Sequence, residues 1–185
     1  QPGATVQLGL RDWQVHAAPG HDPHSVVLFE PQRRLLISAD ALWERGFGVV
    51  FPELEGEQAF AEVEATLDVI EQLQPEWVLP GHGGMFSDVA GALTVARKRL
   101  ADFQADPQRH AQYAAKVLLK YKLLEWQQAS CQQVQDWCAS TPLMQQMRQR
   151  YFADQDPAAW VLALLQALAA ARAVVWEGDQ VRNVD

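Results

Sequence analysis

Hydrophobic and polar residues alternate through the first 40 residues of the chain. The alternation covers Ala4–Leu8 and Trp13–Ala17, and short apolar runs follow at Ser25–Phe29 and Arg34–Ser38. A period of two is typical of half-buried strands, and the residues between the runs give them hairpin spacing. The sequence therefore predicts four short strands in a largely antiparallel sheet.

The period becomes helical from Gly56 onward. Apolar residues recur every three to four positions and predict a helix that Pro75 ends. Trp77–Pro80 is then interpreted as a short buried strand, which leads into the tight glycine-rich turn 81–84. A further helix is predicted after Ser87-Asp88, because either side chain can cap it.

The last 80 residues have a different pattern. Helices are predicted after Asp106-Pro107 and around Cys131–Ala139, Pro142–Phe152 and Pro157–Ala171, with a final hairpin over residues 173–184. Helices closed by a hairpin outline a winged-helix module. We therefore expect a first domain over residues 1–106 and a helical, winged-helix-like module over residues 107–185.

Composition narrows the classes of protein. Apolar residues make up 49% of the chain, but no run reaches the roughly 18 residues that span a membrane. The net charge of −8 lies in residues 1–104, with 7 basic and 15 acidic residues, which disfavours a nucleic-acid binder. Two cysteines, Cys131 and Cys138, are predicted to be reduced thiols, and no targeting signal is visible, as in a cytoplasmic protein.

Histidines and one aspartate carry the candidate chemistry. His16, His21 and His24 lie within nine residues, His82 sits in the glycine-rich turn, and Asp40 follows the fourth predicted strand. Residues that leave strands on glycine- or proline-shaped loops converge at one edge of a sheet. Imidazole and carboxylate groups suit a zinc-type ion. A loop histidine is more often a surface residue and an aspartate a turn residue, so the residues alone leave both interpretations open.

Three motifs carry a resemblance to a known family. Ala-Pro-Gly-His-Asp-Pro-His-Ser, Ser-Ala-Asp-Ala-Leu and Val-Leu-Pro-Gly-His-Gly-Gly, in this order, resemble the later motifs of the metallo-β-lactamase superfamily. Within it, glyoxalase II (hydroxyacylglutathione hydrolase) and related thioesterase-like enzymes are the most similar, and the tail resembles the winged-helix appendage of some members. The resemblance implies an α/β fold, namely the C-terminal half of an αββα sandwich.

The resemblance also implies a site and a reaction. His21 would bind the first of two metal ions, His82 the second, and Asp40 would bridge them. Zinc is the expected metal, with iron or manganese as alternatives. A metal-bound hydroxide would attack a small ester- or thioester-type substrate. His24, Trp43 and Phe47 are expected at the substrate pocket, although a loop folded back onto the sheet explains the two aromatic residues equally well.

One part of the family pattern is absent. No histidine precedes His16, so the His-x-His-x-Asp-His motif that supplies four ligands is missing. Three ligands shared between two positions should hold metal weakly, and the chain alone should be inactive. A chain that begins at Gln1 rather than Met favours a fragment over a natural half.

Two further expectations follow from this missing half. The sheet should expose apolar surface and either self-associate or be covered by the missing N-terminal half. The alternative function is a non-catalytic interaction module whose tail contacts a protein. Contact with DNA is less favoured, because Pro157–Ala171 contains no Arg or Lys.

Overall fold

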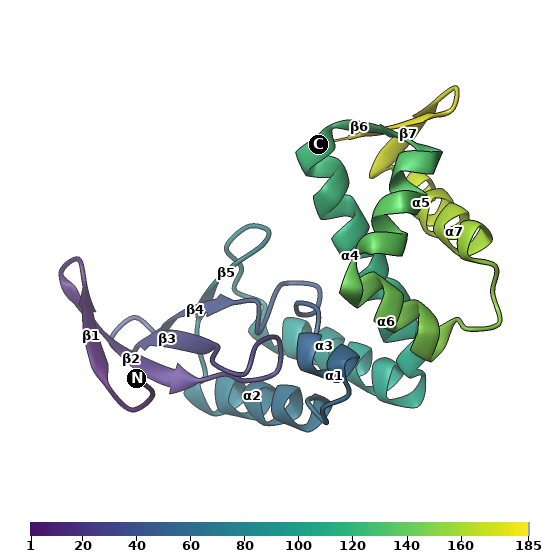
Figure 1. Cartoon of the computed structure of the whole chain (residues 1–185). Helices are drawn as coiled ribbons and strands as arrows, with labels where there is room; N and C mark the ends of the chain where they lie inside the picture. Colours follow the sequence, from purple (N-terminus) through teal and green to yellow (C-terminus); the bar gives the residue numbers. More distant parts are fainter. Residues whose placement is uncertain (185) are drawn as a thin grey trace. The chain divides into compact units, whose positions relative to one another are not determined.

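The computed structural model describes residues 1–184, and this part of the chain has a mixed α/β fold with a five-stranded sheet and seven helices (Figure 1). Internal contacts divide it into two compact units, residues Gln1–Ala105 and the residues from Asp106 onward. Each unit has its own buried apolar residues and its own sheet.

The first unit is built on a sheet with the strand order β1-β2-β3-β4-β5. The strands are β1 (Thr5–Leu8), β2 (Arg11–Ala17), β3 (Val26–Glu30), β4 (Leu35–Ala39) and β5 (Trp77–Pro80). The first four pair antiparallel, as their hairpin spacing predicts. β5 pairs parallel to β4, because the chain between them crosses over through two helices.

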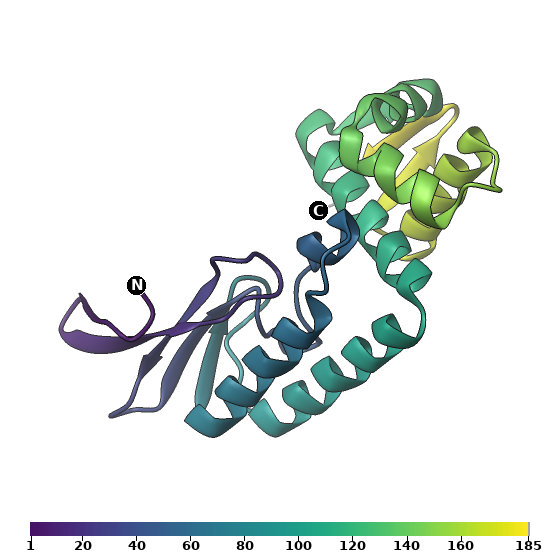
Figure 2. The same ribbon diagram turned by 60° about the horizontal axis from the view of Figure 1, so that its bottom comes forward.

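Three helices complete the first unit: α1 (Phe51–Glu55), α2 (Phe60–Leu73) and α3 (Val89–Ala105). The helical period of α2 buries Phe60, Val63, Leu67 and Ile70 on one side. α2 and α3 lie next to each other along the sheet (Figures 1 and 2). α1 was not predicted from the sequence.

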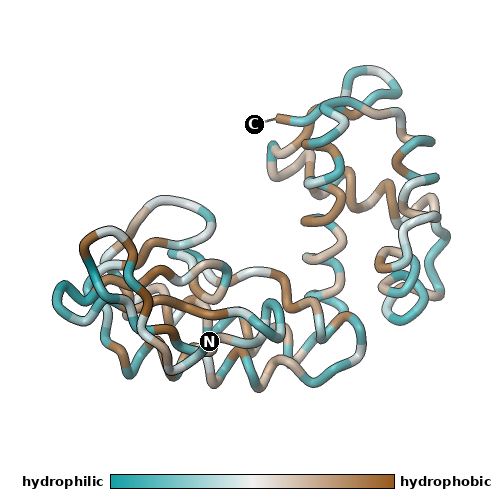
Figure 3. The backbone as a smooth tube through the Cα atoms, turned by 60° about the vertical axis from the view of Figure 1, so that its left-hand side comes forward, coloured by the Kyte–Doolittle hydropathy of each residue, from teal (hydrophilic) through white to brown (hydrophobic). Residues whose placement is uncertain are grey.

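The two faces of this sheet differ in exposure. Val27, Leu36 and Val78 are fully buried on one face. On the other face the apolar residues of β3, β4 and β5 are only partly covered, with Trp77 41% and Leu79 37% exposed, whereas Val15 of β2, which pairs with Leu28, is buried. We call this second surface the open sheet face; its apolar members are Leu28, Leu35, Ile37, Trp77 and Leu79, which the strand register brings together. In Figure 3, brown apolar stretches alternate with paler and teal ones along the backbone of the first unit.

The second unit packs helices against a small sheet. Its elements are α4 (Pro107–Trp126), β6 (Gln128–Ser130), α5 (Cys131–Ser140), α6 (Pro142–Tyr151), α7 (Pro157–Ala170), β7 (Val174–Glu177) and β8 (Gln180–Asn183). The sheet has the order β6-β8-β7, so the last strand is the central one. The predicted helices and hairpin are present, whereas β6 was missed.

Side chains fix the starts of these helices. Asp106 accepts a hydrogen bond from the Arg109 amide, and Asp156 accepts one from the Ala159 amide. Both are N-cap residues that are followed by a proline at the first helical position. Thr141 precedes Pro142 in the same way, but its hydroxyl donates backward to the Trp137 carbonyl at 2.8 Å. Thr141 therefore ties α5 to α6 and does not cap α6.

Two polar side chains of α4 are withdrawn from solvent to different degrees: Lys120 is half-buried and His110 is buried. The Lys120 ammonium on α4 donates to the carbonyls of Ala173 (2.9 Å) and Val184 (2.6 Å) and to the side chain of Asn183. His110, also on α4, is 1% exposed, and burial lowers its pKa to about 4. Lys120 thus fastens the ends of the β7–β8 hairpin to α4.

Two expectations from the sequence concern reduced cysteines and the lack of a membrane-spanning segment. Cys131 and Cys138 are both free, as predicted, and burial raises the pKa of the Cys138 thiol to about 12. Among residues 1–184, none of the helices combines the length and the apolar character needed to cross a bilayer.

Candidate functional site

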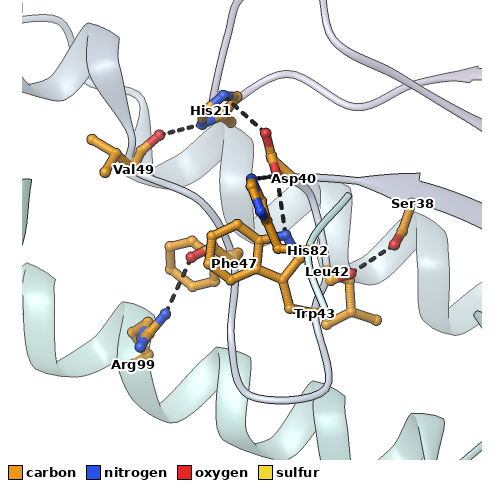
Figure 4. Close-up of polar contacts among 9 residues, drawn as sticks. All are labelled: His21, Ser38, Asp40, Leu42, Trp43, Phe47, Val49, His82 and Arg99. Carbon is orange, nitrogen blue, oxygen red and sulfur yellow. Dashed lines mark hydrogen bonds and ion pairs between the residues drawn. The ribbon is translucent and has the colours of Figure 1, made fainter. Parts of the chain in front are cut away.

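His21, Asp40 and His82 come together at one edge of the first sheet (Figure 4). They follow β2, β4 and β5, and these three strands run in the same direction, so their carboxyl ends share that edge. His21 Nε2 lies 3.4 Å from Asp40 Oδ2, and His82 Nε2 lies 3.6 Å from Asp40 Oδ1. Each carboxylate oxygen therefore faces a different imidazole ring.

The backbone carbonyl of Val49 sets the orientation of His21. Nδ1 of His21 lies 2.6 Å from the Val49 oxygen. A carbonyl can only accept, so Nδ1 carries the hydrogen, and in the neutral ring the lone pair is on Nε2. This nitrogen faces Asp40 Oδ2 at 3.4 Å, so both atoms present lone pairs that could bind a metal ion.

Trp43 holds the carboxylate of Asp40. Its indole Nε1 donates to Asp40 Oδ1 at 3.1 Å, and its ring lies edge-on to His82 at 5.1 Å between ring centres. The Gly48 amide donates to the Asp40 carbonyl at 2.9 Å. Trp43 thus contacts both Asp40 and His82.

Residues 40–50 form a loop that begins at Asp40 and passes next to His21, and we call it the ligand loop. A Cβ atom at Gly48 would lie 2.7 Å from His21 Nδ1 and 2.9 Å from Asp40 Cβ, distances that real Cβ atoms do not show. Glycine is therefore required where the loop passes between these two side chains.

Arg99 of α3 anchors the middle of the ligand loop. Its Nη1 donates to the Phe47 carbonyl at 3.1 Å (Figure 4). The Phe47 ring is 2% exposed and lies edge-on to Phe103 of the same helix, with the ring centres 6.2 Å apart. The loop is thus fixed to α3 by a polar contact and an apolar contact.

The expected pocket residues are placed differently from one another. Trp43 lies at the cluster. Phe47 lines a cavity of only about 10 Å³ beside His21 and Asp40, which is too small for a substrate. His24 is exposed, and within the described chain its side chain makes no hydrogen bond or ion pair with the three clustered residues. The roles of all three at a substrate pocket stay predictions.

The donor types fit a metal site, but their number does not. Each of the two positions beside Asp40 has one imidazole and a share of one carboxylate, whereas zinc usually takes four ligands. Within residues 1–184, no group of three or more His, Cys, Asp or Glu side chains is arranged to hold an ion. This part of the chain therefore does not complete a metal site.

Three functional contacts were missed from the sequence. The Val49 carbonyl and Gly48 act through backbone atoms, and Arg99 is 52 residues away from Phe47 along the chain. The glycines that interrupt residues 46–48 were the available signal for a constrained loop.

The part of the chain that contains the cluster is similar to a known protein family. Residues 1–82 match the family model of the metallo-beta-lactamase superfamily. The match contains all three clustered residues. The five-stranded sheet and its helices are consistent with a metallo-beta-lactamase fold.

Solved structures of this kind are similar to the chain over part of their length. A metallo-beta-lactamase family protein from Thermus thermophilus is 19% identical, with a TM-score of 0.47, and 100% of this chain aligns with 53% of that one. A beta-lactamase domain protein from Burkholderia ambifaria is 23% identical, with a TM-score of 0.49 and coverage of 100% and 51%. The di-iron-bound form of TTHA1623 is 27% identical, with a TM-score of 0.42 and coverage of 52% and 45%. The chain spans about half the length of the metallo-beta-lactamase structures that it matches.

Proposed function

We propose that the intact protein is a metal-dependent hydrolase for a small ester- or thioester-type substrate, of the glyoxalase II type. The arrangement of Asp40 carries this proposal, because its two oxygens face two different imidazole nitrogens at 3.4 and 3.6 Å. A carboxylate placed in this way suits a bridge between two metal ions.

The residues of this chain would have separate roles. His21 would hold one ion, His82 the other, and Asp40 would lie between them, with zinc, iron or manganese as the metal. When bound, such ions supply an activated water and polarise the substrate carbonyl. The Val49 carbonyl fixes the nitrogen that His21 presents, and Trp43 orients the Asp40 carboxylate. His24 would lie at the rim, with Trp43 and Phe47 forming the wall.

The missing donors have to come from outside residues 1–184. We propose that a longer chain or a partner polypeptide supplies a His-x-His-x-Asp-His motif, and that this chain alone binds metal weakly and does not hydrolyse substrate. The open sheet face supports this proposal, because a second sheet layer or a second copy of the chain would cover it.

The gene upstream of Gln1 provides the first test. A His-x-His-x-Asp-His motif at the end of a predicted strand is expected there. The longer protein should then contain about two metal ions and hydrolyse a thioester. Alanine at His21, Asp40 or His82 should remove both properties. Unchanged metal content and hydrolysis in all three variants would refute the proposed function.

The second unit is proposed to be a winged-helix-like module that contacts protein. Its three-stranded sheet and its helices support this proposal, and α7 carries no basic residue that could contact DNA. A low-salt mobility-shift assay should show no tight duplex binding. The free thiols Cys131 and Cys138 support a cytoplasmic location.

A further inference from the structure

In the second unit, α5 packs against α6 and α7 (Figure 1). A pocket of about 360 Å³ is lined by residues of these three helices. Its volume is within the range of small-molecule sites, which is about 300–1,000 Å³. Its lining contains none of His21, Asp40 and His82, so a ligand site here is independent of the proposed hydrolase function.

The floor of this pocket is apolar. Cys138, Trp160 and Val161 line it and are only 3–4% exposed. The thiol of Cys138 stays protonated at neutral pH, because burial raises its pKa to about 12. The floor therefore offers uncharged surface to the flat body of a ligand.

Arg148 supplies a cation at the edge of the pocket. It is half-buried on α6, and within residues 1–184 its guanidinium makes no ion pair or hydrogen bond. Its neighbour Arg150 stacks on Tyr151, and Arg97 and Arg182 pair with carboxylates. A guanidinium presents a planar fork of donors that fits a carboxylate.

Trp160 adds a second donor without a partner. Its Nε1 is buried and has no hydrogen-bond partner among residues 1–184. A buried donor in this state has lost its hydrogen bonds to water without replacing them. Because this atom has almost no accessible surface, its N–H resonance reports changes in the packing of the pocket wall.

Asp136 limits the charge of a ligand. It lines the same pocket from α5 and accepts a hydrogen bond from Gln132 at 2.9 Å. A second negative charge on a ligand would be repelled by this carboxylate. We propose that the pocket binds a small monocarboxylate with a flat apolar body, with its carboxylate on Arg148 and its body on Trp160 and Val161.

Nuclear magnetic resonance of the full chain tests this proposal. Titration with 3-phenylpropionate should move the Trp160 indole N–H resonance saturably, with a Kd below about 1 mM. The neutral 3-phenylpropionamide should bind at least about tenfold more weakly, because it has no charge for Arg148.

Matched variants locate the binding. Arg148→Met should remove the difference between acid and amide. Arg150→Met, on the same helix but outside the pocket lining, should keep it. Ala158→Phe, at an exposed position of the lining, should block both ligands without disturbing the fold. Equal binding of acid and amide, no saturable change at Trp160, or unchanged binding by Arg148→Met would overturn the proposal.

Discussion

The carbonyl of Val49 selects the nitrogen of His21 that faces Asp40, and the absence of a side chain at Gly48 makes room for both residues. At the scale of single residues, the cluster therefore depends on backbone atoms of the ligand loop as much as on its three side chains. Substitutions in this loop should affect the cluster without changing any of its donors.

Gly48→Ala tests this dependence. Its Cβ would meet His21 Nδ1 and Asp40 Cβ at 2.7 and 2.9 Å, so these two residues must shift and the fold should lose about 1–3 kcal/mol. Gly84→Ala is the control, because no atom of residues 1–184 would lie within 4 Å of its Cβ. Urea unfolding measures the loss, and the His21 ring resonances report the shift. Equal stability of the two variants would contradict the proposed packing.

His110 makes the second unit sensitive to acid. Its pKa is about 4 when folded and 6.5 ordinarily, so between these values the unfolded chain binds a proton that the folded chain does not. Above pH 6.5 the neutral His110 does not lower the free energy of unfolding. As the pH falls from 6.5 toward 4, proton uptake by the unfolded chain lowers it progressively. His110 should therefore lower the free energy of unfolding by about 2 kcal/mol between pH 7 and pH 5.

Unfolding of His110→Gln at both pH values isolates this effect. The variant should lose about 2 kcal/mol less than the unchanged chain over the same interval, because its amide does not titrate. The same pH dependence in both proteins would show that other groups are responsible.

At the scale of elements, Arg99 connects α3 to the ligand loop. Arg99→Met should remove the hydrogen bond to Phe47 and speed exchange of the Gly48 amide by about tenfold. Lys98→Met is the control, because Lys98 pairs with Asp102 on the surface of the same helix. Exchange rates that respond equally in both variants would mean that Arg99 does not hold the loop.

Periodicity predicted the longer elements but not the shortest ones. α2 and α7 bury clear stripes, and their positions followed from the apolar spacing. α1 has five residues and β6 has three, which is too short to show a period. The parallel pairing of β4 with β5 was also missed, since period and hairpin spacing do not specify a partner beyond a crossover.

The cluster was predictable because each member follows a strand at a loop shaped by glycine or proline. Its supports were not, because His21 and Val49 are 28 residues apart along the chain and contact only in the fold. Distance along the chain thus separates what the sequence indicated from what only the structure reveals.

At the scale of the whole molecule, the open sheet face is the feature that a partner or a second copy would cover. Trp77→Lys with Leu79→Lys should reduce self-association of the chain, as measured by sedimentation velocity, because both side chains are more than one-third exposed on that face. Leu10→Lys is the control, since Leu10 is fully exposed but belongs to the β1–β2 turn. A chain that is monomeric before substitution would refute this expectation.

The order of strands in the second unit has a consequence for synthesis and for truncation. β8 lies between β6 and β7, although it is the last of the three to leave the ribosome. Some 50 residues must therefore be synthesised after β6 before its hydrogen-bonding partner is available. Until residues 180–183 emerge, the nascent unit exposes unpaired strand edges. A premature stop or a protease cut just before Gln180 would remove the middle of the sheet and leave two strands with no neighbour.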